Sequence, residues 1–240
     1  MLMEQLRWIY RAWIYRLHVE RQEIAFLRSH LSAGDTVVDV GAHKGAFTYW
    51  MAKRVGPRGH VFAFEPQATL ANKLTALVRS RSWSHVVVEN LGASSSEGTA
   101  TLSVPGGKPS PSATLEPYDH GDCETNSVRT VTLDSYFSGR NVPPIKFLKC
   151  DVEGHELEVF RGAVKLLRKH KPVLLFECET RHHRDGRLDE VFQFLSSLGY
   201  RGEFFLHGKL VSLKNFDAAI HQADPLNIAY ANNFVFSASA

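Results

Sequence analysis

The chain has 240 residues, of which 44% are hydrophobic, and its formal net charge is +3 at neutral pH. This length and composition fit one folded α/β domain with a sizeable core, and two full domains would be cramped. So small a positive charge, without a long run of lysine or arginine, predicts no nucleic-acid partner.

The three cysteines, Cys123, Cys150 and Cys178, are scattered along the chain without C-x-x-C spacing. This pattern argues against both a disulfide framework and a zinc knuckle. It favours a reducing compartment, and we therefore expect a cytoplasmic protein.

Residues 1–22 predict an amphipathic helix that precedes the main domain. Its apolar residues recur at helical spacing, at Leu2, Leu6, Ile9, Trp13 and Leu17. Charged residues are interspersed among them, so the segment fits neither a signal peptide nor a membrane-spanning helix. Two alternatives remain for the apolar face. The helix packs on its own domain or across a homodimer, or it lies at the inner face of a membrane with its arginines on anionic lipid.

The stretch from Thr36 to Gly45 predicts a short buried strand, a tight turn and the start of a helix. Asp39 lies near the end of that strand, and Gly41 and Gly45 allow the backbone to approach a ligand closely. At the carboxyl edge of a parallel sheet, such a turn offers backbone N–H groups, a helix N-terminus and a carboxylate to a small polar cofactor.

Two further β–α repeats follow. A second strand is expected over residues 60–64 and a third over residues 85–89, with Glu65 and Asn90 just past their ends. Glu65 lies about 20 residues beyond Gly45, the distance at which a βαβ unit brings an acid to the hydroxyls of a ribose.

The repeat is interrupted at Gly98. Residues 99–104 and 128–133 alternate like exposed strands, and a segment rich in Gly, Pro and Ser joins them. We expect a hairpin insertion over about residues 99–133. Its tip, residues 105–127, is either a lid or plain disorder.

The β–α pattern resumes with strands over residues 145–150 and 172–176, and each of them ends in acidic residues. Near the end of the chain, residues 203–206, 210–213 and 233–236 are strand-like and joined by shorter connections. The predicted fold of residues 23–240 is therefore an α/β doubly wound, mostly parallel sheet with an antiparallel C-terminal edge.

The turn after the first strand has the form G-x-x-x-G rather than G-x-G-x-x-G, which weakens a dinucleotide interpretation, and no P-loop motif occurs. What remains is a nucleoside cofactor without phosphates. S-adenosylmethionine fits this description, because its cationic sulfonium and ammonium groups favour nearby carboxylates.

Four segments carry a family resemblance: DVGAHKG, FAFEP, FLKCDVEGHELEVFRGA and LLFECE. In this order and at these spacings they resemble the FkbM family of S-adenosylmethionine-dependent methyltransferases, from about Glu23 to Gly199. The resemblance implies a Rossmann-like fold with a seven-stranded sheet, and methylation of hydroxyl groups on sugars and polyketide-type products. By motif, Asp39, Gly41 and Gly45 would line the methionine part of the cofactor and Glu65 the ribose. The full candidate cofactor set is Asp39, Gly41, Ala42, Gly45, Glu65, Asn90 and Asp151.

Methyl transfer to oxygen is an in-line displacement, for which the enzyme positions two reactants and excludes water. A base that accepts the hydroxyl proton adds about 10²- to 10⁴-fold. The candidate bases follow the fourth and fifth strands of the parallel sheet: Asp151, His155, Glu177 and His182. Lys149 shares a strand face with Asp151, where it forms either a buried ion pair or part of the catalytic group. No ligand cluster demands a metal.

We therefore expect an O-methyltransferase acting on a hydroxyl of a sugar, a glycan, or a glycosylated or polyketide-type metabolite. The alternatives are a Rossmann-type nucleotide-dependent oxidoreductase and a cofactor-binding module without turnover, which the N-terminal helix would recruit to a membrane. The sequence does not name the acceptor.

Overall fold

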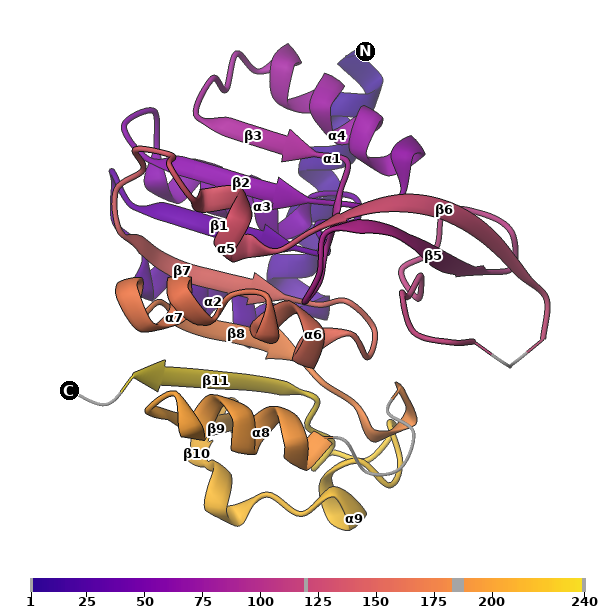
Figure 1. Cartoon of the computed structure of the whole chain (residues 1–240), viewed down its shortest axis with the longest axis vertical. Helices are drawn as coiled ribbons and strands as arrows, with labels where there is room; N and C mark the ends of the chain where they lie inside the picture. The colour runs from indigo at the N-terminus through magenta and orange to yellow at the C-terminus, as the bar shows by residue number, and fades with distance from the viewer. Residues whose placement is uncertain (1, 119–120, 183–187, 239–240) are drawn as a thin grey trace.

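The computed structural model describes residues 2–118, 121–182 and 188–238. Its centre is an eight-stranded sheet in the order β10-β9-β11-β8-β7-β1-β2-β3 (Figure 1). The strands are β1 (Thr36–Val40), β2 (His60–Phe64), β3 (Val86–Glu89), β7 (Ile145–Cys150), β8 (Val173–Glu177), β9 (Tyr200–Leu206), β10 (Lys209–Ser212) and β11 (Asn233–Ala238).

The strands β1, β2, β3, β7 and β8 are parallel, whereas β11 runs antiparallel between β8 and β9. β7 pairs directly with β1, although more than one hundred residues separate them, so the strand order reverses between these two strands. In open α/β sheets, ligands bind at the carboxyl ends of the strands beside such a reversal. The fold therefore predicts a site where β1 and β7 end.

Helices cover both faces of the sheet (Figure 1). One face carries α1 (Leu2–Ile14), a π-helix η1 (Tyr15–Val19), α2 (Arg21–His30), α3 (Ala46–Val55) and α4 (Ala68–Ser80). The other carries α5 (Leu133–Phe137), α6 (Glu156–Arg161), α7 (Val164–His170) and α8 (Leu188–Ser197). Each face of the sheet packs against its helices in a separate hydrophobic core. Successive residues of β1 point to opposite faces, so Val37 lies in the first core and Val38 in the second.

A hairpin projects from one end of the sheet (Figure 1). It consists of β5 (Gly98–Pro105) and β6 (Cys123–Val131), and β4 (Gly92–Ala93) pairs with β6 to make a separate three-stranded sheet. Three short helices complete the described chain: η2 (Thr180–His182), η4 (Leu213–Asn215) and α9 (Ala218–His221).

The predicted α/β fold and its antiparallel C-terminal edge are confirmed, but the main sheet has eight strands in the described residues, not seven. The strand beyond the seven that the family resemblance implies is β10, which pairs antiparallel with β9 and matches the strand expected over residues 210–213. The helix expected over residues 1–22 also differs, since α1 and η1 end at Val19 and α2 begins at Arg21. This segment packs on its own domain through Trp8 and Ala12, which are buried, while most of the face predicted from spacing is exposed.

Candidate functional site

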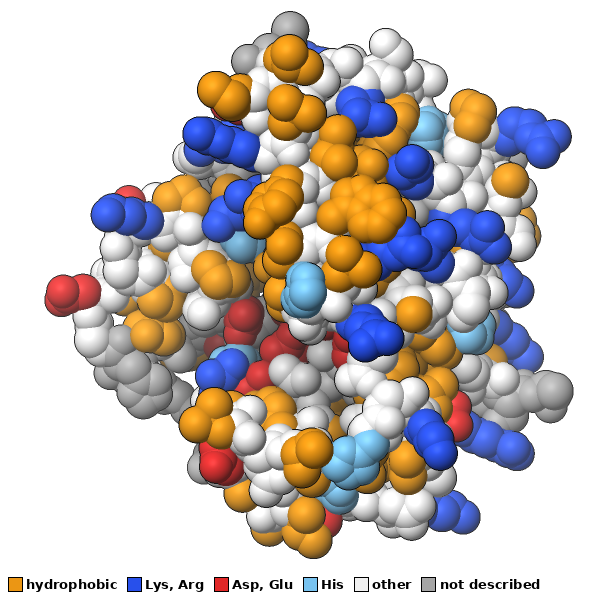
Figure 2. Space-filling model, turned by 180° about the vertical axis from the view of Figure 1, so that it is seen from behind, with side chains coloured by type: hydrophobic (Ala, Val, Ile, Leu, Met, Phe, Trp, Pro, Cys, Tyr) orange, Lys and Arg blue, Asp and Glu red, His pale blue; other side chains and the backbone are white. Residues whose placement is uncertain are grey.

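A pocket opens at the carboxyl ends of β1, β2, β7 and β8. Its wall comes from the turn after β1, the end of β2, the acidic turn after β7, the hairpin tip and the N-terminal segment. Figure 2 shows acidic side chains gathered in a hollow of this face of the molecule. The acidic residues that line the pocket are Glu20, Glu65, Asp151, Glu153 and Glu177.

The turn after β1 touches the backbone that follows β7. Gly41 has a φ of +76°, and a Cβ there would lie 1.8 Å from the carbonyl oxygen of Asp151. Its N–H and that of Ala42 both donate to the carbonyl oxygen of Phe64. A glycine is therefore required both for the conformation and for the contact. Gly41 and Ala42 line the pocket, which is the position that a close-approach turn predicts.

Lys149 joins the two turns. Its ammonium donates to the Asp151 carboxylate at 2.9 Å and approaches the carbonyl oxygen of Gly41 at 3.4 Å. The side chain is buried, which opposes the charge, but Asp151 and Asp39 more than compensate and raise the pKa of Lys149 above its ordinary value. The lysine is thus a fixed cation beneath the acidic pocket.

Asp39 lies behind the pocket wall rather than in it. Its side chain is fully buried, accepts a hydrogen bond from the Thr48 hydroxyl at 2.6 Å, and is not among the residues that line the pocket. Its second oxygen has no hydrogen-bond partner among the described residues. Burial raises the pKa of Asp39, and the charge of Lys149 partly offsets this effect.

Glu65 closes the end of β2 and lines the pocket with an almost fully buried carboxyl group. One oxygen accepts the N–H of His43 at 2.7 Å and the other accepts the N–H of Gln67 at 2.8 Å. Burial raises its pKa to about 7, against these two hydrogen bonds. Each oxygen keeps a second lone pair, so the carboxyl group can still accept the two hydroxyls of a ribose.

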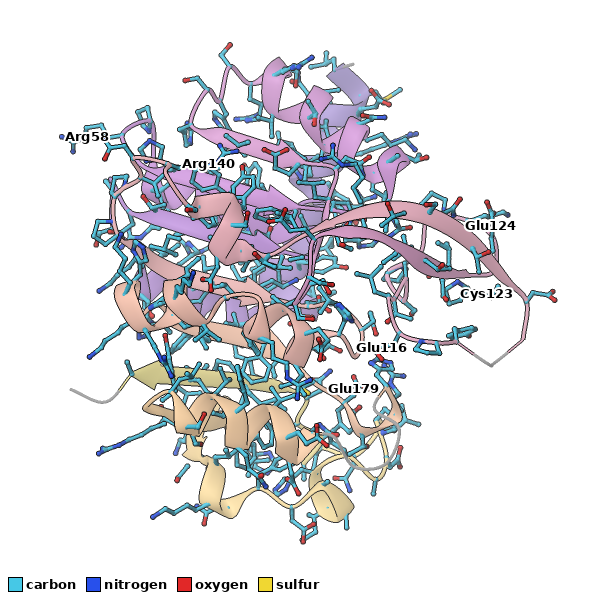
Figure 3. All side chains as sticks on the ribbon, viewed as in Figure 1. Arg58, Glu116, Cys123, Glu124, Arg140 and Glu179 are labelled. Carbon is cyan, nitrogen blue, oxygen red and sulfur yellow. The ribbon has the colours of Figure 1, made fainter. Side chains whose placement is uncertain are left out.

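Glu177 and Glu179 share a hydrogen bond at the end of β8, and the Asn232 amide donates to both of them, at 2.9 Å and 2.8 Å. Burial, the charge of Asp151 and the contact with Glu179 raise the pKa of Glu177 to about 11. Glu177 is therefore protonated at neutral pH and is a hydrogen-bond donor rather than a base. Figure 3 shows Glu179 beyond the end of β8, on the same side of the sheet as Glu116 of the hairpin tip.

Glu153 is a second pocket carboxyl with an unusual setting. Its φ is +53°, and its Oε2 lies 3.1 Å from Nδ1 of His182. Burial, followed by the charges of Asp151 and Glu156, raises its pKa to about 8. Its turn is held by Glu156, whose carboxylate accepts the N–H groups of Val152 and Gly154. A carboxyl with this pKa exchanges its proton near neutral pH.

The hairpin tip is fixed over the pocket at three places. Gln67 and the backbone of Ser110 exchange two hydrogen bonds of 2.9 Å each. The Thr114 hydroxyl donates to the carbonyl oxygen of Glu153 at 2.7 Å, and Glu116 lies 2.8 Å from His155. The hairpin tip was expected to be either a lid or disordered. Its described residues contact the turn after β2, at Gln67, and the turn after β7, at Glu153 and His155.

The pocket brings together about half of the residues predicted from sequence. Gly41, Ala42, Glu65, Lys149, Asp151 and Glu177 line it. His155 and His182 do not line it. His182 contacts Glu153, which lines the pocket, whereas His155 contacts Glu116 of the hairpin tip. Gly45 instead receives the Trp8 indole N–H on its carbonyl oxygen, and Asn90 donates to the carbonyl oxygens of Glu65 and Pro66 and lines a neighbouring depression.

Sequence reasoning missed the pocket residues of the N-terminal segment, Arg11, Tyr15 and Glu20. No motif marks them, because they reach the site only through the packing of α1 and η1 beside α3. His43 was not among the predicted site residues either, although it lines the pocket and its Nε2 is buried without a hydrogen-bond partner among the described residues. Burial first, then the charge of Lys44, lowers the pKa of His43 to about 4.

The model of the methyltransferase FkbM domain matches residues 39–201, more than half of the chain. The chain belongs to the FkbM methyltransferase family. It is 30% identical over 152 residues to the hexuronic acid methyltransferase AglP of Haloferax volcanii, a match that covers 63% of this chain. The chain spans only 59% of the length of that relative.

Solved structures with this fold include two further methyltransferases. The FkbM methyltransferase of Methylobacillus flagellatus has a TM-score of 0.54 and 19% identity, over 86% of this chain and 44% of that protein. An O-methyltransferase of Bacillus cereus, solved with S-adenosylhomocysteine, has a TM-score of 0.56 and 12% identity, over 99% and 91% of the two chains. These likenesses confirm the Rossmann-like methyltransferase fold of the FkbM chain.

Proposed function

We propose that this FkbM protein is an S-adenosylmethionine-dependent O-methyltransferase whose acceptor is a hydroxyl group of a sugar or glycan. The observation that carries the proposal is the pocket itself. A close-approach glycine turn, a ribose-type acid and several buried carboxyls meet where β1 and β7 end. Family membership favours methyl transfer over the oxidoreductase alternative.

The pocket residues fit the proposed cofactor. Gly41 leaves room where a side chain would clash, and Glu65 suits the two ribose hydroxyls. The excess of carboxyl groups over cations suits a ligand that carries a sulfonium and an ammonium. When bound, S-adenosylmethionine supplies a methyl group on a cationic sulfur that an oxygen nucleophile can displace in line.

Glu153 is the proposed base. It lines the pocket, its pKa of about 8 lies near the working range of a general base, and His182 orients it. Asp151 is engaged by Lys149, and Glu177 holds its own proton at neutral pH. In this scheme Glu153 accepts the hydroxyl proton, the hairpin tip excludes water, and Lys149 keeps the two acidic turns in register.

The relative AglP is named for hexuronic acid, which makes sugars the first acceptors to test. Purified protein would be incubated with methyl-labelled S-adenosylmethionine and paired glycosides that differ only at C6, a hexose and the corresponding hexuronate. Label on a hydroxyl of either sugar supports the proposal. Label as an ester on the uronate carboxyl, or on neither sugar while S-adenosylhomocysteine binds, would contradict the hydroxyl assignment.

We also propose that the protein is cytoplasmic and contacts the membrane surface through α1. None of the helices in the described residues is long and apolar enough to cross a membrane. The outer side of α1 and η1 instead carries a stripe of residues that are 40–71% exposed: Leu2, Met3, Leu6, Tyr10, Trp13 and Leu17. Figure 2 shows apolar side chains on this face bordered by Lys and Arg.

The Lys and Arg side chains that border this apolar stripe favour contact with a membrane surface of anionic lipid. A symmetric dimer through the same stripe would bring its basic borders together. Vesicles of phosphatidylcholine with and without phosphatidylglycerol separate the two. We expect flotation only with the anionic vesicles, lost in Leu6→Asp and kept in the matched control Leu226→Asp, whose parent side chain is 93% exposed. Absence of flotation, or a dimer in solution that Leu6→Asp dissociates, would contradict lipid docking.

A further inference from the structure

The N-terminal segment supplies part of the pocket wall that lies outside the matched family domain. Arg11 on α1, Tyr15 on η1 and Glu20 before α2 line the pocket, whereas the family match begins at residue 39. These side chains therefore reach the pocket from outside the matched family region.

The segment is held firmly against the turn that follows β1. The Trp8 indole N–H donates to the carbonyl oxygen of Gly45 at 2.9 Å, and the Trp50 indole N–H donates to that of Ala12 at 2.7 Å. Trp8 is 1% exposed and packs edge-on against Tyr49. Arg11 is thus placed by the same residues that place the start of α3. Glu20 follows η1, and its N–H donates to the carbonyl oxygen of Tyr15.

The two side chains differ in the ligand charge that each can bind. Arg11 belongs with Lys44 on the cationic side, where both disfavour protonation of His43, and no carboxylate of the described residues forms a salt bridge with Arg11. Glu20 belongs to the acidic side. Burial, its neighbour Glu23 and then Asp151 raise the pKa of Glu20 to about 8. Glu20 is therefore mostly protonated in the empty pocket, and a bound cation would favour its carboxylate form.

We propose that Arg11 and Glu20 bind the amino-acid end of S-adenosylmethionine, with the guanidinium on its carboxylate and the carboxylate of Glu20 on its ammonium. This inference rests on the proposed function. A neutral sugar hydroxyl requires no charged pair, whereas an α-amino acid is a zwitterion that an acid and a base match. The unpartnered Nε2 of His43, buried on the cationic side, adds a polar atom that a ligand can satisfy.

Two ligands that differ only at the amino-acid end test the inference by calorimetry. S-adenosylhomocysteine carries that end, and 5′-methylthioadenosine keeps the nucleoside and sulfur without it. We expect Arg11→Met and Glu20→Gln each to weaken S-adenosylhomocysteine binding by about tenfold or more, as loss of a charge-assisted hydrogen bond predicts. Binding of 5′-methylthioadenosine should change less than about twofold. Arg7→Met, an exposed change on the same helix, is the matched control and should leave both affinities unchanged.

Equal weakening of both ligands in the Arg11 and Glu20 variants, or no weakening of either, would overturn the inference. A thermal unfolding scan of each variant identifies a loss that comes from displacement of α1. If the wild-type protein binds neither ligand, the proposed function fails instead, so the two failures are distinguishable.

Discussion

The ammonium of Lys149 and the carboxylate of Asp151 lie 2.9 Å apart, with Lys149 near the end of β7 and Asp151 directly after the strand. Breaking a buried ion pair by removing one partner leaves an uncompensated charge. We expect Lys149→Met to lower the free energy of unfolding, measured by urea denaturation, by less than the roughly 3–5 kcal/mol of a fully buried pair, because the Asp151 side chain is 32% exposed. The double variant Lys149→Met/Asp151→Asn should recover part of this loss. A double variant less stable than the single one would contradict a compensating pair.

Gly41 is predicted to be intolerant of any side chain. Gly41→Ala combines an unfavourable φ with a Cβ that would meet the carbonyl oxygen of Asp151, so stability and cofactor affinity should both fall. Gly34→Ala is the matched control, since Gly34 has a φ of +95° but nothing within 4 Å of an added Cβ. The control should lose only the strain term, about 1–2 kcal/mol. Equal losses in the two variants would show that the contact with the turn after β7 is unimportant.

The effect on kcat of replacing Glu153 or Glu177 tests which of these two pocket carboxyls is the base. Glu153→Gln should lower kcat by about 10²- to 10⁴-fold with a smaller effect on KM. In the wild-type enzyme kcat should rise with pH through about 8, because Glu153 must be ionised to accept a proton. Glu177→Gln should lower kcat less than about tenfold, since Glu177 is already protonated. The reverse order of effects would make Glu177 the base.

Stability should depend on pH through Glu177. Its folded-state pKa of about 11 lies far above that of an unfolded glutamate, about 4.3. The folded chain therefore keeps a proton that the unfolded chain releases, and this contribution to stability is lost as pH rises above about 4.3. Between about pH 5 and pH 8, unfolding free energies of Glu177→Gln should fall less steeply than those of the wild type, by about 1 kcal/mol per pH unit. Parallel curves would contradict the raised pKa.

Most of the fold follows from local pattern. The strands β1, β2 and β7 begin and end where the apolar runs and the following acidic or glycine residues predict. The boundaries of the hairpin strands were less accurate, because β6 extends to Cys123 through residues without alternation. Its pairing with β5, not its own sequence, makes that part a strand.

Site residues that directly follow or end a strand could be predicted from the sequence. Those whose position depends on tertiary packing could not. Glu65, Asp151 and Glu177 reach the pocket because each follows or ends a parallel strand. Asp39 does not, because the pleat directs it toward Thr48 on α3. Glu20 lies outside every motif in the sequence, and it reaches the pocket only through the packing of the N-terminal segment beside α3.

Calorimetric titration with S-adenosylhomocysteine, in the wild-type protein and in Glu65→Gln and with NAD as the comparison ligand, tests whether the pocket binds the methyl donor. We expect saturable binding of S-adenosylhomocysteine, clearly weaker binding in Glu65→Gln at unchanged thermal stability, and no heat from NAD. Failure of the wild type to bind S-adenosylhomocysteine, equal binding by the variant, or measurable binding of NAD would contradict this assignment of the pocket.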